Sequence, residues 1–362
     1  MLRYPVYKPY LEGNERKYLN QALDSGWISS KGDFLSNFEA QFASYLDVES
    51  ATAVSNGTVA LHVILQALGV KQGDEVIVPT FTYIASVNAI LYVGAIPVFV
   101  DSLHGSWNLD PEDVRRKVND KTVAIMAVHL YGNPCRMADL LDICTEFNLM
   151  LLEDAAEAFG SKYEGRFVGS FGKLSTFSFF GNKTLTTGEG GMIVSNDSAS
   201  VDRVAHLKSQ AVDSQKEYWH DELGFNYRMT NLCAAIGVAQ LEVADLILKR
   251  KRTIFSWYKK FLHNSGVEFQ LIESNAESSY WMVSILCQSE QMRSILRGEL
   301  KARGIETRPA FPLANRMPYI DYPASFPVAD LISRCALNLP SYPALEEGDV
   351  ATISMCIRDV VD

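Results

Sequence analysis

The sequence lacks the cysteine spacings that hold zinc or build a disulfide framework. Its six cysteines are scattered over 362 residues, and no two of them form a CxxC pair. In a chain of this length, that pattern argues against both kinds of cross-link. We therefore expect no metal ion and a reduced, cytoplasmic protein.

Positive charge and long apolar runs are also scarce. The formal net charge is −10, and nucleic-acid binding needs clustered Lys and Arg, so no nucleic-acid partner is expected. The longest apolar stretch, 84–100, is interrupted by Asn88, Gly94 and Pro97, which favours a helix and a buried strand over a membrane span. The first residues carry no apolar run that would indicate a signal peptide. An anionic small ligand is still compatible with this composition if cations gather in one cleft.

The sequence is rich in apolar residues, and these follow a regular pattern along the chain. Hydrophobic residues make up 48% of the chain, enough for a full core. Short apolar runs alternate with helical patterns over the first two thirds, which predicts an α/β fold with a mostly parallel central sheet flanked by helices. The helix at 58–68 presents one apolar face. The expected strands are 75–79, 97–101, 123–128, 149–154, 175–180 and 191–195.

After Asn231 the pattern changes. Residues 232–262 are typical of one long helix or two abutting helices, and the basic cluster Lys249–Arg252 is expected on its solvated face. The remaining segments indicate a smaller α+β domain, with strands near 280–287 and 305–309 and helices near 291–303 and 346–358. We therefore divide the chain into a large domain, 1–245, and a small C-terminal domain, 246–362.

Three segments of the large domain fall where ligands collect in α/β sheets, beyond the carboxyl ends of the strands. Gly57 and Thr58 open a helix, whose free N–H groups bind phosphate, although an ordinary helix cap is the favoured explanation when this segment is taken alone. Asp154 and Glu157 follow an apolar strand. Carboxylates there hold a metal, a ribose or a protonated ring nitrogen, or simply favour a helix start.

The third segment surrounds Lys183. This lysine lies just past an aromatic-rich strand and before a glycine-rich turn, and the spacing fits neither a P-loop nor GxGxxG. Most lysines are solvated surface groups. A lysine among Phe, Gly and Asn at a sheet end is instead a candidate for a desolvated amine with a depressed pKa that can form a Schiff base.

These pieces together fit one cofactor, pyridoxal phosphate. It needs an amine for its aldehyde, a carboxylate for its ring nitrogen and N–H donors for its phosphate. Lys183 and Asp154 supply the first two groups. Ser178 joins Gly57 and Thr58 as the phosphate cradle, and an aromatic residue from 81–83 covers the ring.

The chain resembles the DegT/StrS family of sugar-nucleotide aminotransferases, which are fold type I pyridoxal phosphate enzymes. The resemblance is closest over residues 4–260 and looser beyond. The segments that carry it are SNGTVALH (55–62), VHLYGNP (128–134), EDAAEAFGSKY (153–163), STFSFFGNKTLTTGEGGMIVSND (175–197) and GFNYRMTN (224–231).

The resemblance implies a role for several single residues. Lys183 matches the Schiff-base lysine, Asp154 the carboxylate beneath the ring nitrogen, and Glu157 the residue that reaches the 3′-oxygen of the cofactor. Tyr83 matches an aromatic residue against the ring. Asn226 matches an asparagine that reaches the phosphate held by the other subunit, which implies a homodimer with shared active sites.

The resemblance also implies a reaction. The segments are most similar to members that aminate the C4 ketone of GDP-4-keto-6-deoxy-D-mannose with L-glutamate as amino donor. A lysine at 183 favours transamination, because a related dehydratase carries histidine there. The alternatives are a 3- or 4-aminotransferase for a dTDP- or UDP-linked keto sugar and, from another class, a non-catalytic regulatory protein of the same fold.

The substrate pyrophosphate must be met by positive or N–H groups. Arg308 and Lys208 are candidates, and so is the segment with Trp219 and His220, whose aromatic rings suit a base. Ordinary surface or core placement is the competing interpretation for each. His129, which ends a strand, is expected to be a structural histidine.

Overall fold

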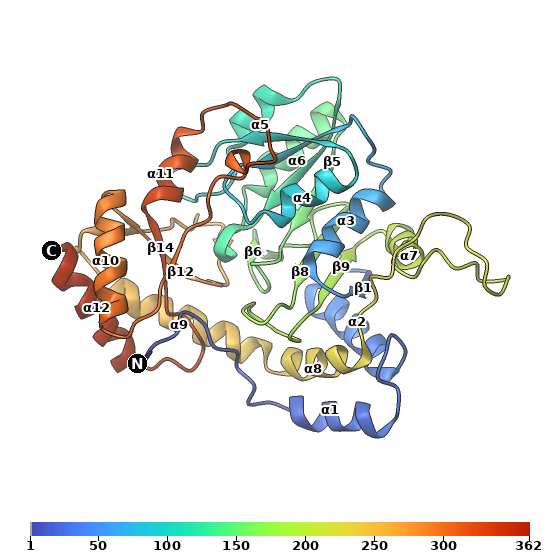
Figure 1. The fold of residues 1–362 in the computed structure, drawn as a ribbon, viewed down its shortest axis with the longest axis horizontal. Helices are drawn as coiled ribbons and strands as arrows, with labels where there is room; N and C mark the ends of the chain where they lie inside the picture. The colour runs from blue at the N-terminus through green and yellow to red at the C-terminus, as the bar shows by residue number, and fades with distance from the viewer. Residues whose placement is uncertain (1) are drawn as a thin grey trace.

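The centre of the molecule is a seven-stranded sheet (Figure 1). The computed structural model describes residues 2–362. Six strands of this sheet run in one direction and only β9 runs against them, so the predicted mostly parallel sheet is confirmed. In spatial order the strands are β1 (Ser50–Val54), β9 (Gly191–Ser195), β8 (Leu174–Ser178), β5 (Met150–Asp154), β4 (Thr122–Val128), β2 (Glu75–Pro79) and β3 (Ile96–Val100).

Helices cover both faces of this sheet because its strands alternate their side chains between two cores. Val76 and Val78 belong to one core, whereas Ile77 between them belongs to the other. The first core is completed by α3 (Gly57–Ala67), α4 (Ala85–Tyr92) and α7 (Ser198–Leu207). The opposite face is covered by α2 (Asp33–Leu46), α5 (Pro111–Lys117), α6 (Met137–Phe147) and α8 (Asn231–Glu242), with α1 (Glu15–Asp24) packed against α8.

The observed elements lie within two residues of the predicted ones through most of the sheet. The strands at 75–79 and 191–195 have the predicted bounds. The sequence did not indicate β1, whose small residues Ser50, Ala51 and Thr52 give no apolar run; pairing with β9 makes it a strand.

The C-terminal part forms a second, antiparallel sheet beside the first. Its spatial order is β10 (Val267–Phe269), β12 (Val283–Cys287), β14 (Ala336–Leu339) and β13 (Arg308–Pro309). Around it lie α10 (Glu290–Ala302), α11 (Pro327–Cys335) and α12 (Glu347–Val361), with short 3-10 turns at η1 (Leu130–Gly132) and η2 (Ala314–Arg316). A third, small sheet pairs β11 (Ala276–Glu277) with β6 (Lys162–Tyr163) and β7 (Arg166–Phe167), which joins the two parts of the chain. The domain boundary near residue 245 stays a prediction.

The predicted pair of abutting helices is present as α8 and α9 (Ala244–Phe261), which meet at an angle of 62°. Within residues 2–362, no single helix has the length and apolar content to cross a membrane. Only α8 and α9 taken together have that length and apolar content, and the chain bends sharply between them. The start of α9 packs in the core of α2 and α8, and its later residues pack with α12.

The prediction of a solvated basic face on α9 holds for Lys249, which is exposed, but is wrong for Lys251 and only partly right for Arg250. Lys251 is only 1% exposed and donates to the carbonyl oxygen of Ser341 at 2.9 Å. Arg250 donates to the carbonyl of Pro343, also at 2.9 Å. These cations hold the C-terminal loops because backbone carbonyls accept the hydrogen bonds that water would otherwise provide.

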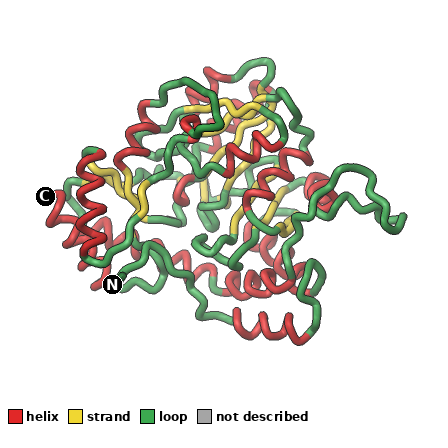
Figure 2. The backbone as a smooth tube through the Cα atoms, viewed as in Figure 1, coloured by secondary structure: helices red, strands yellow, loops and turns green. Residues whose placement is uncertain are grey.

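A long connection between α7 and α8 leaves the body of the molecule. Figure 2 shows it as a loop that extends away from both sheets. The end of this loop returns to the main sheet, where the amide of Ser55 donates to the carbonyl of Tyr227 at 2.7 Å. The connection thus begins and ends beside the start of α3, at the edge where the parallel strands finish.

Candidate active site

Asp154 lies at the carboxyl end of β5, in the middle of the main sheet. Its side chain is buried, and its Oδ2 accepts a hydrogen bond from the hydroxyl of Ser86 at 2.7 Å. Its Oδ1 accepts from the amide of Ala156 at 3.1 Å. The carboxylate is therefore fixed in direction, as an acid that must face one ring nitrogen requires. Ser86, in the first turn of α4, was not predicted from the sequence.

Lys183 and Glu157 form a buried pair beside this carboxylate. The Nζ of Lys183 lies 3.8 Å from Oε1 of Glu157, whose other oxygen accepts from the amide of Tyr131 at 2.8 Å. Burial lowers the pKa of Lys183, while Glu157 and Asp154 oppose that effect. Burial raises the pKa of Glu157 to about 7, although Lys183 pulls it down. The structure thus places a desolvated amine where the sequence predicted one.

Gly57, Thr58 and Ser178, the residues predicted to bind a phosphate, lie close together in the structure. β1 ends before the N-terminus of α3, and β8 ends at Ser178, so these residues share one edge of the sheet. A Cβ added at Gly57 would lie 2.9 Å from the Cβ of Ser178, too close for any residue but glycine. The side chain of Asn56 caps the helix through the amide of Val59 at 3.0 Å.

The residues present fit pyridoxal phosphate. A buried amine, a fixed carboxylate and a helix N-terminus with a glycine that admits close approach lie along one edge of one sheet. These are the three groups that the aldehyde, ring nitrogen and phosphate require. Tyr83 packs against Phe311 with ring centroids 5.8 Å apart, which adds an aromatic surface from the segment before α4 and from the C-terminal part.

The residues predicted for the substrate are not brought together in the single chain described by residues 2–362. Trp219 and His220 lie on the extended loop between α7 and α8 (Figure 1), where His220 Nδ1 is 2.7 Å from the carbonyl oxygen of Gln210. Arg308 is exposed on β13 and pairs with Glu306 at 3.3 Å. Asn226 is exposed and accepts from Arg228 at 3.1 Å. Their roles stay predictions.

Lys208 does not suit the pyrophosphate role that the sequence allowed it. Its Nζ is buried and donates to the hydroxyl of Thr52 at 2.5 Å and to the carbonyl of Ala53 at 2.7 Å, and it lies 3.3 Å from Glu39. Its hydrogen-bonding capacity is used inside the protein. The lysine ties α7 to β1 instead of facing a ligand.

Behind Asp154, a buried polar network supports the end of β5. Glu153 is 0% exposed and accepts from the amides of Gly169 and Phe171, each at 2.8 Å, and of Gly172 at 2.6 Å. Nε2 of His129 lies 3.1 Å from the same carboxylate, and Nδ1 accepts from the amide of Cys135. The prediction of a structural histidine is confirmed.

Glu153→Gln is expected to lower the free energy of unfolding by about 3 kcal/mol at pH 7, since an amide NH₂ cannot accept the backbone hydrogen bonds. Burial raises the pKa of Glu153, but His129 and the amides outweigh it, so the net pKa is lowered. The stabilisation is therefore present above the unfolded pKa and is lost as pH falls through the lower folded value. Urea unfolding at pH 7 and at pH values below the ordinary pKa of glutamate measures this, with the exposed Glu12→Gln as control. Equal stability of wild type and variant at pH 7 would contradict the prediction.

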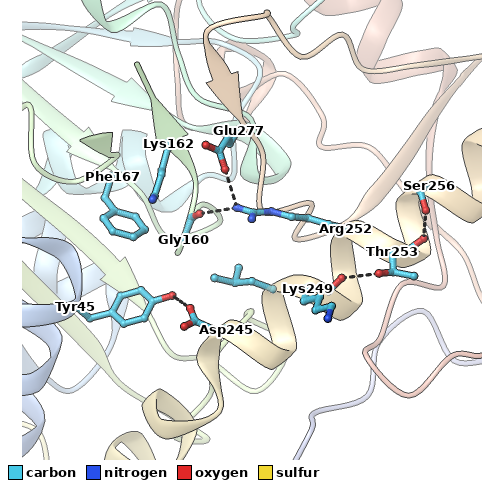
Figure 3. A pocket seen from close by; sticks show the side chains of 11 residues that line it. Tyr45, Gly160, Lys162, Phe167, Asp245, Lys249, Arg252, Thr253, Ser256 and Glu277 are labelled. Carbon is cyan, nitrogen blue, oxygen red and sulfur yellow. Dashed lines mark hydrogen bonds and ion pairs between the residues drawn. The ribbon is translucent and has the colours of Figure 1, made fainter. Parts of the chain in front are cut away.

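A separate pocket of about 580 Å³ opens beside the first turns of α9 (Figure 3). Arg252 lies there 3.5 Å from the carboxylate of Glu277, and Tyr45 donates to Asp245 at 2.7 Å. None of the residues predicted for cofactor or substrate lines this pocket. Because it shares no lining residue with the Lys183 site, this pocket is distinct from it.

The fold and the site together define a pyridoxal phosphate-dependent transferase. The comparisons with known proteins agree: the DegT/DnrJ/EryC1/StrS aminotransferase family model matches residues 9–358, and the chain belongs to this family. The predicted family, enzyme class and cofactor are thereby confirmed.

Relatives and solved structures extend over nearly the whole chain. GDP-perosamine synthase of Escherichia coli O157:H7 is 52% identical over 98% of both chains, and GDP-perosamine synthase of Vibrio cholerae is 50% identical over 98% of both. The crystal structure of 3-amino-5-hydroxybenzoic acid synthase, 30% identical, superimposes with a TM-score of 0.93 over 99% of this chain and 98% of that one.

Proposed function

We propose that this protein transfers an amino group from L-glutamate to the C4 ketone of GDP-4-keto-6-deoxy-D-mannose, giving GDP-perosamine, as a cytoplasmic homodimer with pyridoxal phosphate. The observation that carries the proposal is the 50–52% identity, along the full chain, to two proteins named GDP-perosamine synthase. The buried lysine at 183 supports catalysis over the alternative of a regulatory protein, because a regulator has no use for a desolvated amine.

Different residues of the site move the proton and orient the amine that carries it. Pyridoxal phosphate, when bound, supplies an aldehyde for the amines and a ring that stores the electron pair left when a proton is removed. Lys183, as a neutral amine, takes the α-proton of the donor and delivers a proton to C4 of the sugar. Burial supports that role because it lowers the pKa of the amine. Glu157 at 3.8 Å holds Nζ on the reacting side.

Asp154 and the cradle hold the cofactor in place. The carboxylate of Asp154, oriented by Ser86, would face the ring nitrogen and keep it protonated. Gly57 and Thr58 at the start of α3 offer N–H groups and the positive end of the helix dipole to the phosphate, and Ser178 adds a hydroxyl. Because one face of C4 is then directed toward Lys183, the new amine has a single configuration.

The substrate assignment is tested by incubating the purified protein with pyridoxal phosphate, L-glutamate and each of three substrates: GDP-, dTDP- and UDP-linked 4-keto-6-deoxy sugars. Mass spectrometry and NMR of the product identify the aminated sugar and the carbon that carries nitrogen. We expect a 4-amino product from the GDP sugar. A product from the dTDP or UDP sugar alone, or amination at C3, would replace the substrate assignment, and no product from any of them would remove the activity.

The homodimer predicts that two inactive variants restore each other. If Asn226 completes the site of the partner subunit, a mixture of Lys183→Ala and Asn226→Ala forms mixed dimers in which one of two sites is intact, giving about a quarter of wild-type activity. The two variants are unfolded together, refolded and assayed, with each variant refolded alone as control. Light scattering gives the mass of the assembly. A monomer, or a mixture no more active than its components, would contradict the shared site.

A further inference from the structure

The main chain of Lys183 is held on both sides by donors from distant segments. The carbonyl oxygen of Lys183 accepts a hydrogen bond from the hydroxyl of Tyr7. The carbonyl of the preceding residue, Asn182, accepts from the indole Nε1 of Trp281 at 2.7 Å. These donors come from the N-terminal segment and from the segment before β12. A lysine side chain has four rotatable bonds, so the position of its Nζ depends on how firmly its backbone is held.

Tyr7 is itself fixed by backbone hydrogen bonds of the preceding residue and by a contact of its own ring. The amide of Val6 donates to the carboxylate of Glu306 at 3.0 Å, and the carbonyl of Val6 accepts from the amide of Ser341 at 3.2 Å. The buried ammonium of Lys251 lies 5.7 Å from the centre of the Tyr7 ring. Burial raises the pKa of Tyr7, so its hydroxyl keeps the proton that it donates. The N-terminal segment thus connects the C-terminal part of the fold to the Lys183 loop.

Trp281 contacts Lys183 in two ways. Its indole N–H holds the backbone, and its ring lies 4.1 Å from Nζ, within the range of a cation–π contact. The ring is 5% exposed and stacks on Tyr131, with ring planes 16° apart, which fixes its own orientation. One side chain therefore restrains both ends of the lysine.

We propose that Tyr7 and Trp281 are positioning residues that clamp the main chain of Lys183 and so place its Nζ for proton transfer. The inference rests on the proposed role of Lys183 and extends it to two residues of the C-terminal and N-terminal segments. Neither side chain exchanges a proton with the substrate. A shift of the amine by about 1 Å slows proton transfer by as much as 100-fold. Loss of the clamp is therefore expected to lower kcat more than it weakens substrate binding.

The test compares Tyr7→Phe, which removes only the O–H donor, with Trp281→Phe, which keeps an aromatic ring but removes the N–H donor and reduces the ring surface beside Nζ. Tyr18→Phe is the matched control, because its hydroxyl donates at 2.6 Å to Glu242 on an exposed surface. We expect kcat to fall about 10- to 100-fold in each clamp variant while KM for the keto sugar changes by less than about threefold. A rise in KM with kcat unchanged, or the same loss in Tyr18→Phe, would overturn the clamp.

A second measurement is independent of turnover. In the protein without cofactor, amide hydrogen exchange of the 181–187 peptide is expected to be at least about tenfold faster in both clamp variants than in wild type and in Tyr18→Phe. Unchanged exchange in both clamp variants would overturn the proposal. If wild type shows no aminotransferase activity but the exchange rates differ as expected, the clamp stands and the proposed function fails. Because the donors lie in separate segments, a folding failure of one variant leaves the other to decide.

Discussion

Lys183→Ala is expected to abolish turnover, with kcat at least about 10⁴-fold below wild type. The buried amine is placed to move a proton both from the donor and to the sugar carbon, and no other lysine in residues 2–362 lies beside Asp154 and Glu157. Because alanine has no amine, neither of these two proton transfers has a group that replaces Lys183. Steady-state rates with the GDP sugar and L-glutamate measure the effect.

The matched control is Lys173→Ala, which removes a lysine ten residues earlier that pairs with Asp197 on the surface. Its kcat should equal that of wild type. Circular dichroism establishes that both variants are folded. Borohydride reduction of the wild-type holoprotein followed by peptide mapping locates the attachment of the cofactor, which we expect at Nζ of Lys183. A Lys183→Ala protein within tenfold of wild-type activity, or a label on another lysine, would refute the assignment.

Asp154→Asn is expected to lower kcat by about 10²- to 10³-fold. Asparagine has nearly the same shape, but its single oxygen can accept from the hydroxyl of Ser86 or from the amide of Ala156 and not from both, so the substitution removes the charge and one of these two hydrogen bonds. Without the carboxylate, the ring nitrogen loses the partner that keeps it protonated, and the ring stores negative charge poorly. The measurement is kcat for the amino-donor half-reaction and for the sugar half-reaction separately, and both should fall.

Asp245→Asn is the control for this charge change. Asp245 also accepts a hydroxyl hydrogen bond at 2.7 Å, from Tyr45, but it lies in the separate pocket beside α9. Its removal should leave both half-reactions unchanged. If Asp154→Asn retained more than a third of wild-type activity in both half-reactions, the carboxylate would have no part in activating the ring.

The groups that carry the cofactor chemistry could be predicted because each lies next to a recognisable strand or helix end. Asp154 follows the apolar run of β5, and Gly57 precedes the apolar face of α3. Parallel strands end at one edge of a sheet, so residues far apart in sequence were expected to meet there. The sheet confirms this, because β1, β5 and β8 all finish at that edge.

The supporting residues could not be predicted in the same way. Ser86 bonds Asp154 from 68 residues away, Tyr7 bonds Lys183 from 176 and Trp281 bonds Asn182 from 99, and none carries a local pattern that indicates a partner. Two lysines whose surroundings the sequence did not indicate show the converse. Lysine is usually a surface residue, yet Lys208 and Lys251 are buried. Both donate hydrogen bonds to carbonyls that only the folded chain brings near.

The sequence by itself determined the α/β class and the cofactor and predicted which lysine is reactive, since hydrophobic periodicity and residue chemistry are local properties. Only the tertiary structure decided which way the carboxylate of Asp154 points, how far Lys183 lies from Glu157 and what holds the lysine in place. Those features depend on hydrogen bonds and burial between segments that the chain joins only through long loops, and such contacts have no signature in the order of residues.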